Sequence, residues 1–244
     1  MKPVALLALV FAFNAAGAAA EGLTPEEVKR LALEAILENP EIVFEAAAII
    51  RDREEAARAQ TVRSTITELK DALEADPNAP VLGNPAGDVT VVEFFDYNCP
   101  YCMQAAGEVQ TLIETDPNVR LVYREWPILG EGSVYAARAA LAAREQDLYE
   151  EFHWALMEER ARKDEAVVLR VAARVGLDIE RLKADMEGET VRAHIAQSMA
   201  LARMLGFSGT PSFVIGEEGV NGLVSVGELR QYVAEARAPA AEGN

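Results

Sequence analysis

The sequence predicts an α/β fold with a block of inserted helices, preceded by an N-terminal helical extension. Three observations support this class. Residues 89–123 have the pattern strand, helix, strand. Residues 133–205 are rich in Ala, Leu, Glu and Arg and show no strand pattern, and residues 24–75 show helical spacing. A strand–helix–strand unit of about thirty-five residues forms one right-handed crossover in a sheet.

The first residues are typical of an export signal. Lys2 precedes an apolar run at residues 4–13, and Ala18, Ala19 and Ala20 form a small-residue cleavage site. Residues 1–20 are therefore predicted to be a signal peptide, and the run is too short to cross a bilayer. Cleavage would leave the protein in the bacterial periplasm, an oxidising compartment in which disulfides persist.

The chain is acidic. Its 244 residues carry a formal net charge of −17 at pH 7, with 40 Asp and Glu against 23 Lys and Arg. Nucleic acids and anionic membrane surfaces attract basic patches, so we expect neither as a partner.

Two helices are predicted in the N-terminal segment, residues 21–75. Thr24 to Glu27 form a capping box with proline at the first helical position, which predicts a helix over 25–38. Asn39 and Pro40 open a second helix that runs to about Ala75. Coiled-coil spacing relates five of its apolar residues, Ala59, Val62, Ile66, Leu69 and Leu73. We expect residues 24–75 to assemble a homo-oligomer, although the same residues could instead fold back on the catalytic domain as an intramolecular clamp.

A linker is predicted at residues 76–88, because Pro77, Pro80, Pro85 and Gly87 break regular structure. The second domain then covers residues 89–244. Its first strand, 89–95, is β-branched and aromatic, which is typical of a strand covered on both faces. A helix from the cysteine motif to Asp116 and a strand over 119–123 follow.

Helices are expected from about 133 to 205, three to five in number, with Gly176 and Gly188 between some of them. A strand over 212–216 comes next. Asn221 and Gly222 predict a hairpin turn within 217–222, a returning strand over 223–226, and a closing helix from Gly227.

The two cysteines of the chain, Cys99 and Cys102, enclose Pro100 and Tyr101 at the start of a predicted helix. Unpaired N–H groups and the helix dipole favour an anion there, so Cys99 is predicted to be the attacking thiolate, openly accessible to other polypeptides. Cys102, one turn further on, would be the resolving thiol.

Glu93 lies in the middle of the apolar strand before this motif. Burial would raise the pKa of its carboxyl, which could then take or give the proton of the resolving cysteine. The alternative is an edge-facing or hydrogen-bonded glutamate with no redox role.

The strand from Val91 to Phe95, the C-P-Y-C motif, the helical block and Gly209-Thr210-Pro211 together resemble DsbA-family thiol–disulfide oxidoreductases over residues 89–236. The resemblance implies a thioredoxin-like fold with an inserted helical domain. It also implies that Thr210 and Pro211 form a cis-proline turn, which would bind substrate together with Pro100 and Tyr101.

The N-terminal extension resembles the ScsC-like branch, in which such a segment assembles subunits and the protein can act as a disulfide isomerase. The resemblance implies client proteins with cysteines, a membrane redox partner and no cofactor. Tyr101 carries no charge, so we expect a Cys99 pKa between the ~7 of thioredoxin and the ~3.5 of DsbA. The reduction potential would lie between about −270 and −120 mV.

Other roles for the two cysteines remain open. A structural disulfide closing so small a ring would add little stability. A zinc site needs two more ligands, and His153 and His194, expected on helix faces, show no pairing with the motif. Two thiolates could hold Cu(I) in a copper carrier, although Met199 and Met204 are expected in the core rather than as copper ligands. A holdase that grips clients with its N-terminal helices is the remaining alternative.

Overall fold

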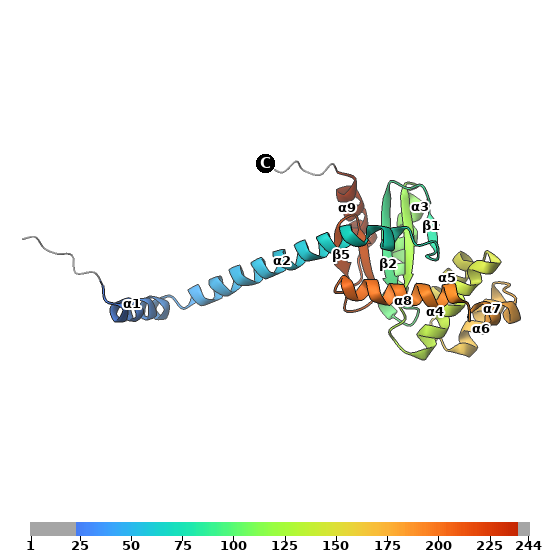
Figure 1. Cartoon of the computed structure of the whole chain (residues 1–244), viewed down its shortest axis with the longest axis horizontal. Coiled ribbons are helices and arrows are strands. Elements are labelled where there is room, and N and C mark those ends of the chain that lie inside the picture. Colours follow the sequence, from blue (N-terminus) through green and yellow to red (C-terminus); the bar gives the residue numbers. More distant parts are fainter. Residues whose placement is uncertain (1–22, 239–244) are drawn as a thin grey trace, which may run out of the picture. The chain divides into compact units, whose positions relative to one another are not determined.

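The computed structural model describes residues 23–238 (Figure 1). The predicted signal peptide, residues 1–20, lies outside the described residues. The chain divides into two compact units, one up to Arg53 and one from Glu54 onward. α2 (Glu41–Glu74) contributes to both units.

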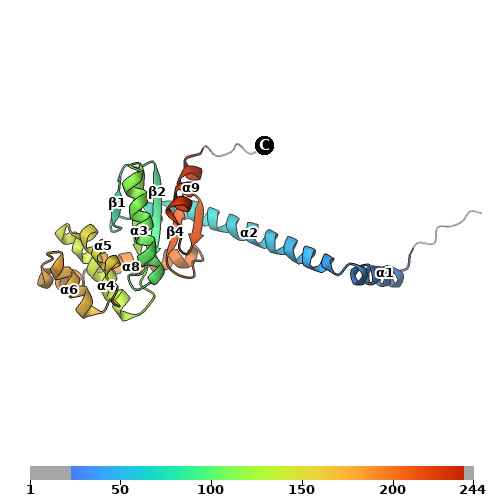
Figure 2. The ribbon, with the colours of Figure 1, turned by 180° about the vertical axis from the view of Figure 1, so that it is seen from behind.

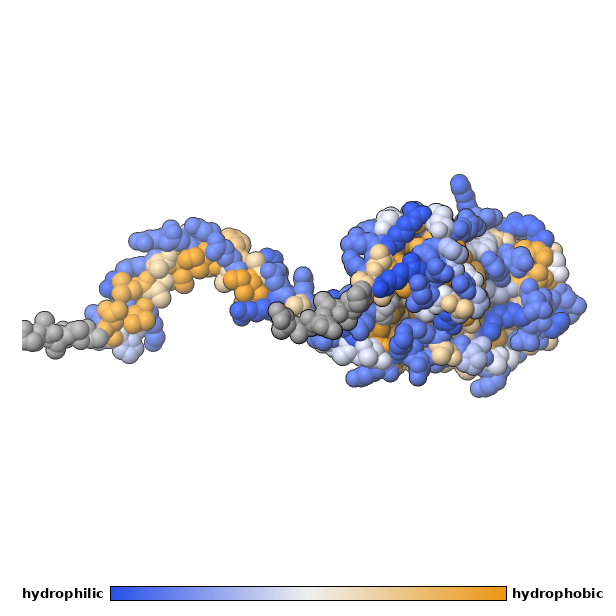
Figure 3. Space-filling view, turned by 90° about the horizontal axis from the view of Figure 1, so that it is seen from above, coloured by the Kyte–Doolittle hydropathy of each residue, from blue (hydrophilic) through white to orange (hydrophobic). Residues whose placement is uncertain are grey.

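The N-terminal unit consists of α1 (Pro25–Glu38) and the first part of α2. The predicted capping box is confirmed: the backbone N–H of Glu27 donates to Thr24 Oγ1 at 3.3 Å, and the N–H of Thr24 donates to Glu27 Oε2 at 2.9 Å. None of the residues of α1 is buried. Figure 3 shows hydrophobic surface along these helices. The large exposed apolar residues of the N-terminal unit are Leu23, Val28, Leu31, Leu33, Ile36, Leu37, Ile42, Val43, Phe44, Ile49 and Ile50.

The second unit is built on a sheet of five strands in the order β1-β3-β2-β4-β5. They are β1 (Val81–Gly83), β2 (Val89–Phe95), β3 (Val119–Glu125), β4 (Ser212–Ile215) and β5 (Glu218–Asn221). β2 and β3 are parallel, and the other neighbours are antiparallel. α3 (Pro100–Thr115) connects β2 to β3, which confirms the predicted crossover.

Each face of the sheet has its own hydrophobic core. Side chains alternate along a strand, so Val91, Glu93 and Phe95 face one side and Val92 and Phe94 face the other. α3 and α9 (Val226–Arg237) cover the first side, as Figure 2 shows. The last part of α2 and α8 (Glu189–Met204) cover the second side.

The last part of α2 therefore packs on the sheet of its own chain. Ile66 and Leu73 are 2% and 1% exposed, and Val62 and Leu69 pack against the same core. A Cβ atom at Gly219 of β5 would lie 2.8 Å from Val62 Cγ1, so glycine is needed for the close approach of the helix. From Val62 to Leu73 the apolar residues thus form the intramolecular clamp and are not free for self-association. The spacing of these residues predicts an apolar helix face, but it does not tell whether the same chain or a second copy covers that face.

The prediction of a linker at residues 76–88 is wrong. This segment contains β1, in which Val81 lies opposite Val122 of β3, and Leu82 is buried. A strand of three residues between prolines is too short to show a strand pattern in the sequence. The boundary expected between residues 75 and 89 instead falls between Arg53 and Glu54.

The predicted block of inserted helices is confirmed. It comprises α4 (Glu131–Ala143), the short 3₁₀ helix η1 (Arg144–Gln146), α5 (Tyr149–Glu158), α6 (Glu165–Arg174), α7 (Ile179–Asp185) and α8. Gly176, with φ of +90°, separates α6 from α7, and Gly188 separates α7 from α8. Within residues 23–238, none of the helices has the length and apolar character that a bilayer span requires.

The hairpin lies earlier than predicted. Ile215 pairs with Glu218, so the turn consists of Gly216 and Glu217, and the returning strand is 218–221 rather than 223–226. Gly216 has φ of +60° and supplies the positive φ that a two-residue turn needs. Asn221 ends the strand instead of forming the turn.

Candidate active site

The dithiol lies where β2 ends and α3 begins. Cys99 is the N-cap residue of α3 and Pro100 is its first residue, which confirms the predicted position of the motif. The N–H of Cys99 donates to the carbonyl of Asp96 at 3.0 Å. Proline suits the first turn, because the N–H that it lacks would have had no helical partner.

The two thiols differ strongly in acidity. The pKa of Cys99 is lowered to about 5, chiefly by a hydrogen bond from the Cys102 thiol and further by the backbone N–H groups of Tyr101 and Cys102; burial opposes this. The pKa of Cys102 is raised far above its ordinary value by burial, by its hydrogen bond to Cys99 and by the charge of Glu93. Near pH 7 the site therefore holds one thiolate, at Cys99, and one thiol, at Cys102.

Cys99 is less accessible than the sequence predicts. Only 5% of its surface is exposed, and Cys102 is fully buried. In the thiol form Cys99 Sγ donates to the carbonyl of Thr210 at 3.2 Å, so the segment that carries Thr210 lies directly against the sulfur. Neither cysteine is in a disulfide.

The peptide bond between Thr210 and Pro211 is cis, as the resemblance implied. It follows α8 and directly precedes β4, next to the β2 end from which the dithiol emerges. The turn and the dithiol thus meet at one end of the sheet, through the contact between Cys99 and Thr210.

Glu93 is buried, so the alternative of an edge-facing glutamate is wrong. Its pKa is raised to about 8, first by burial and then by the negative charge of Cys99. Its Oε2 atom has no hydrogen-bond partner among the described residues. Burial without a cationic partner keeps this carboxyl protonated near pH 7.

Pro100 and Tyr101 lie on the outer side of the motif. Tyr101 is 60% exposed, and Pro100 is exposed as well. Both residues therefore lie at the surface of the protein next to Cys99.

A second buried acid, Glu125, was missed in the sequence. Tyr97 and Tyr149 both donate to its Oε1 atom, at 3.3 and 3.1 Å. Burial raises the pKa of Glu125 well above its ordinary value. It lies at the end of β3, on the same sheet face as Tyr123, which pairs with Glu93. The strand predicted from the sequence ends at Tyr123, whereas β3 runs to Glu125. The alternation of side chains along the strand places Glu125 on the inner face only when the strand includes it.

His153 of α5 completes this buried polar cluster. Its Nδ1 lies 3.0 Å from the Tyr97 hydroxyl, and its ring lies 4.4 Å from that of Tyr123. Burial lowers the pKa of His153 to about 3, so the ring is neutral near pH 7. Four polar atoms on this face lack a hydrogen-bond partner among the described residues: Glu93 Oε2, Tyr123 Oη, Glu125 Oε2 and His153 Nε2.

Two side chains before the motif hold it against the neighbouring loops. Asp96 Oδ2 accepts from the N–H groups of Ile128 and Leu129, at 2.8 and 2.9 Å. Asn98 Oδ1 accepts from the N–H of Lys163 at 2.7 Å, and Asn98 Nδ2 donates to its carbonyl at 3.1 Å. The residues just before Cys99 are thereby fixed to the loop before α4 and to the loop between α5 and α6.

Four residues were weighed as metal ligands. His153 and His194 lie on inserted helices, α5 and α8, as expected, and both are buried with hydrogen-bond partners inside. Met199 and Met204 are 40% and 53% exposed and do not belong to the core. Within residues 23–238, there is no group of three or more His, Cys, Asp or Glu side chains arranged to hold a metal ion.

A mixed sheet with a C-x-x-C dithiol at a helix start and a cis-proline turn beside it defines a thioredoxin-like protein of the thiol–disulfide oxidoreductase type. The model of the DSBA-like thioredoxin domain matches residues 90–234. The chain therefore belongs to the DSBA-like thioredoxin domain family.

Solved structures agree with this assignment. A thioredoxin-like oxidoreductase from Silicibacter pomeroyi DSS-3 is 65% identical, with a TM-score of 0.69, and the match covers 70% of this chain and 98% of that one. A linker-deletion variant of Proteus mirabilis ScsC is 25% identical, with a TM-score of 0.69, and the match covers 89% of this chain and 98% of that one.

The chain also matches part of larger proteins. It is 34% identical over 162 residues to the Na(+)/H(+) antiporter NhaA 3 of Salinispora tropica, which covers 66% of this chain and 25% of the antiporter. The chain thus spans a quarter of the length of that relative.

Proposed function

We propose that the protein is an exported thiol–disulfide oxidoreductase that forms, reduces or isomerises disulfide bonds in client proteins. The observation that carries the proposal is the difference between the two thiols: Cys99 has a lowered pKa at the helix start, and Cys102 has a raised pKa beneath it. A thiolate nucleophile with an adjacent protonated thiol suits attack followed by resolution.

In the proposed reduction of a client, the Cys99 thiolate attacks one sulfur of the client disulfide and releases the other as a thiolate. Glu93 first releases its own proton to solvent. Cys102 then loses its proton to the Glu93 carboxylate and attacks Cys99, which forms the Cys99–Cys102 disulfide and releases the second client thiolate. The charge of Cys99 is absent in the mixed disulfide, which removes one cause of the raised pKa of Glu93. Client oxidation is the reverse, with Glu93 giving its proton to Cys102.

Thr210, Pro211, Pro100 and Tyr101 would bind the client around Cys99. The backbone next to a cis-proline can pair with an extended peptide in β fashion. The contact of the Thr210 carbonyl with Cys99 Sγ at 3.2 Å supports this role, because a client cysteine would bind next to the same sulfur.

Isomerisation would depend on assembly through the N-terminal unit. The exposed apolar residues of α1 and the start of α2 offer a surface for self-association, which would bring several dithiols together. This replaces the surface first expected, since Val62 to Leu73 are covered within the chain. An isomerase also needs its dithiol kept reduced, which is the role proposed for a membrane redox partner.

The test is the refolding of a scrambled protein with several disulfides. The full-length protein and a version starting at Glu54 are compared, with light scattering for both and with Cys99→Ser as the inactive control. We expect oxidoreductase activity in both and isomerase activity only in the full-length oligomer. Two results would contradict the proposal and favour a holdase or a copper carrier. One is oxidoreductase activity in Cys99→Ser, and the other is no such activity in either the full-length protein or the version starting at Glu54.

A further inference from the structure

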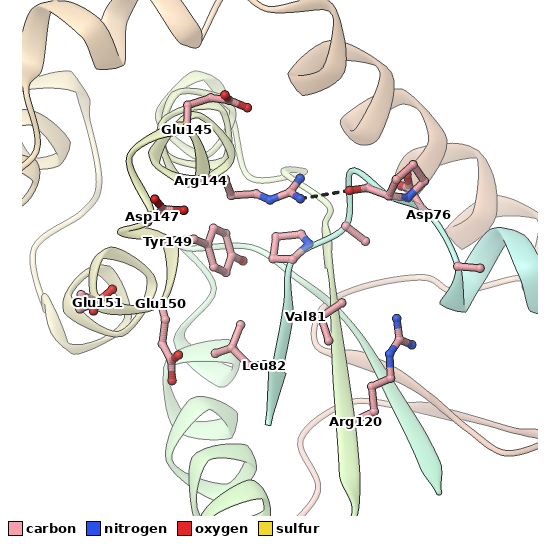
Figure 4. Close-up of a pocket in the computed structure, with 14 residues that line it drawn as sticks. Asp76, Val81, Leu82, Arg120, Arg144, Glu145, Asp147, Tyr149, Glu150 and Glu151 are labelled. Carbon is pink, nitrogen blue, oxygen red and sulfur yellow. Dashed lines mark hydrogen bonds between the residues drawn. The ribbon is translucent and has the colours of Figure 1, made fainter. Parts of the chain in front are cut away.

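A groove separate from the dithiol lies beside β1 (Figure 4). It encloses about 690 Å³. β1 and the residues just before it form one side, from Ala75 to Leu82, and η1 with the start of α5 forms the other, from Arg144 to Glu151. None of the residues proposed for thiol chemistry lines it.

One side of the groove is a free sheet edge. β1 is one of the two outermost strands of the sheet, and within residues 23–238 its only strand partner is β3. The carbonyl of Pro80 accepts from Tyr123 N–H at 3.0 Å, and Asn84 N–H donates to the carbonyl of Val119 at 2.9 Å, so these positions face β3. Backbone groups alternate along an antiparallel strand, so Val81 directs its N–H and carbonyl to the opposite side, into the groove.

The other side of the groove is acidic. Glu145, Asp147, Glu150 and Glu151 are exposed and form no ion pair within residues 23–238. Figure 4 shows Glu150 extending beside Leu82 of β1.

The two cations of the groove are already engaged with backbone carbonyls. Arg144 donates to the carbonyls of Pro77 and Asn78, and Arg120 donates to that of Glu74 at 2.8 Å. These contacts hold both guanidinium groups against the groove wall.

We propose that this groove binds an extended, basic segment of another polypeptide, which adds to the sheet as a strand beside β1. An edge strand offers main-chain hydrogen bonds to an extended chain, and alternate side chains then give specificity. A strand that places lysine or arginine at every second position would direct these side chains to the four carboxylates. The β1 edge supplies the geometry and the acidic wall supplies the charge preference.

The test uses the reduced full-length protein and a fluorescein-labelled seven-residue peptide that alternates lysine and valine and contains no cysteine. Fluorescence anisotropy should show binding that weakens as salt is added, because the charges are exposed. Without a cysteine the peptide cannot react with the dithiol, so the result does not depend on the proposed function.

Two matched changes separate the edge from the charge. A peptide of the same sequence with alternate amides N-methylated, on the lysines in one version and on the valines in another, keeps its charge but loses donors of the added strand. We expect at least tenfold weaker binding for one of these versions.

The variant Asp147→Asn/Glu150→Gln/Glu151→Gln tests the acidic side of the groove and should also bind the peptide at least tenfold more weakly. The control Glu68→Gln/Asp71→Asn/Glu217→Gln, at exposed carboxylates outside the groove, should bind within twofold of the unmodified protein.

Hydrogen exchange reads out the edge directly. The amide of Val81 should exchange more slowly with the peptide bound. Equal binding of all three peptides, an unchanged affinity of the groove variant, or unchanged exchange at Val81 would each overturn the proposal.

Discussion

The two faces of the central sheet hold buried acids in opposite settings. On the face covered by α2 and α8, Asp76 Oδ2 forms an ion pair with Arg124 Nη1 at 2.6 Å and lies 3.1 Å from His194 Nδ1. On the face covered by α3, Glu93 and Glu125 have no cationic partner within residues 23–238. Neighbouring residues of β3 supply both settings, because Arg124 and Glu125 point to opposite faces.

The acidities follow from these settings. Burial alone would raise the pKa of Asp76, but the hydrogen bond from His194, the N–H of Asn78 and the charge of Arg124 hold it below its ordinary range. His194 Nε2 accepts the N–H of Glu125 at 3.3 Å, so the proton of the neutral ring lies on Nδ1 and is donated to Asp76. Glu93, without such partners, has a raised pKa. The paired acid is ionised and holds the fold together, whereas the unpaired acid keeps its proton near pH 7.

The largest expected effect is on stability, from removal of the helix that covers the paired face. A version starting at Ala79 loses Ile66, Leu73 and Asp76, and burial losses of this kind cost about 2–5 kcal/mol per large apolar side chain. We expect a loss of more than about 5 kcal/mol in the free energy of unfolding in urea. The version starting at Glu54 is the control and should match the full-length protein. Equal stability of the two shortened versions would refute the intramolecular clamp.

The next effect comes from breaking the buried pair. Arg124 also donates to the carbonyls of Ala72 and Leu73 at the end of α2, so Arg124→Met leaves Asp76 and both carbonyls without this partner. Removing one partner of a buried pair costs about 3–5 kcal/mol. We expect that loss in urea unfolding, with unchanged disulfide exchange per folded molecule. A large fall in exchange rate at unchanged stability would show that this face also serves the chemistry.

On the unpaired face the expected effect is kinetic. Glu93→Gln keeps the shape but cannot carry a proton, so resolution of the mixed disulfide should slow roughly 100-fold, as for loss of a general acid or base. Rapid-quench measurement of the mixed disulfide tests this. Glu114→Gln, at an exposed residue of α3, is the control. An unchanged resolution rate would remove the proton role from Glu93.

The last effect is a slope of stability with pH, which is smaller over any single pH unit than the losses above. Glu93 titrates near 4.3 when unfolded and at about 8 when folded, so between these values only the folded state holds the proton. Its contribution to stability is complete below pH ~4.3 and is lost as the pH rises to 8, with a slope of at most about 1.4 kcal/mol per pH unit. Glu93→Gln should therefore gain stability relative to the unmodified protein across this range. A difference that stays constant with pH contradicts the raised pKa.

Much of this architecture could be predicted from the sequence. The capping box at Thr24, the apolar strand around Val92 and the proline after Cys99 are local signals, and each gave an element in its correct place. The cis bond before Pro211 came from the resemblance and not from local physics, because most bonds before proline are trans.

The rest depends on contacts between distant residues. The spacing of Val62 to Leu73 shows an apolar helix face but not its partner, and β1 is recognisable only from its pairing with β3. Glu125 and His153 are polar residues that burial alone makes relevant, because they meet Tyr97 across 28 and 56 residues of sequence. The exposed fraction of Cys99 depends on Thr210, 111 residues away.

The central claim is that near pH 7 Cys99 is ionised while Cys102 keeps its proton. Ultraviolet absorbance of the thiolate, followed with pH in the reduced protein and in Cys99→Ser, tests it most directly. We predict one midpoint near 5 that is absent from the variant, and no second thiolate in the neutral range. A midpoint above about 7.5, close to that of an ordinary cysteine, would contradict the account.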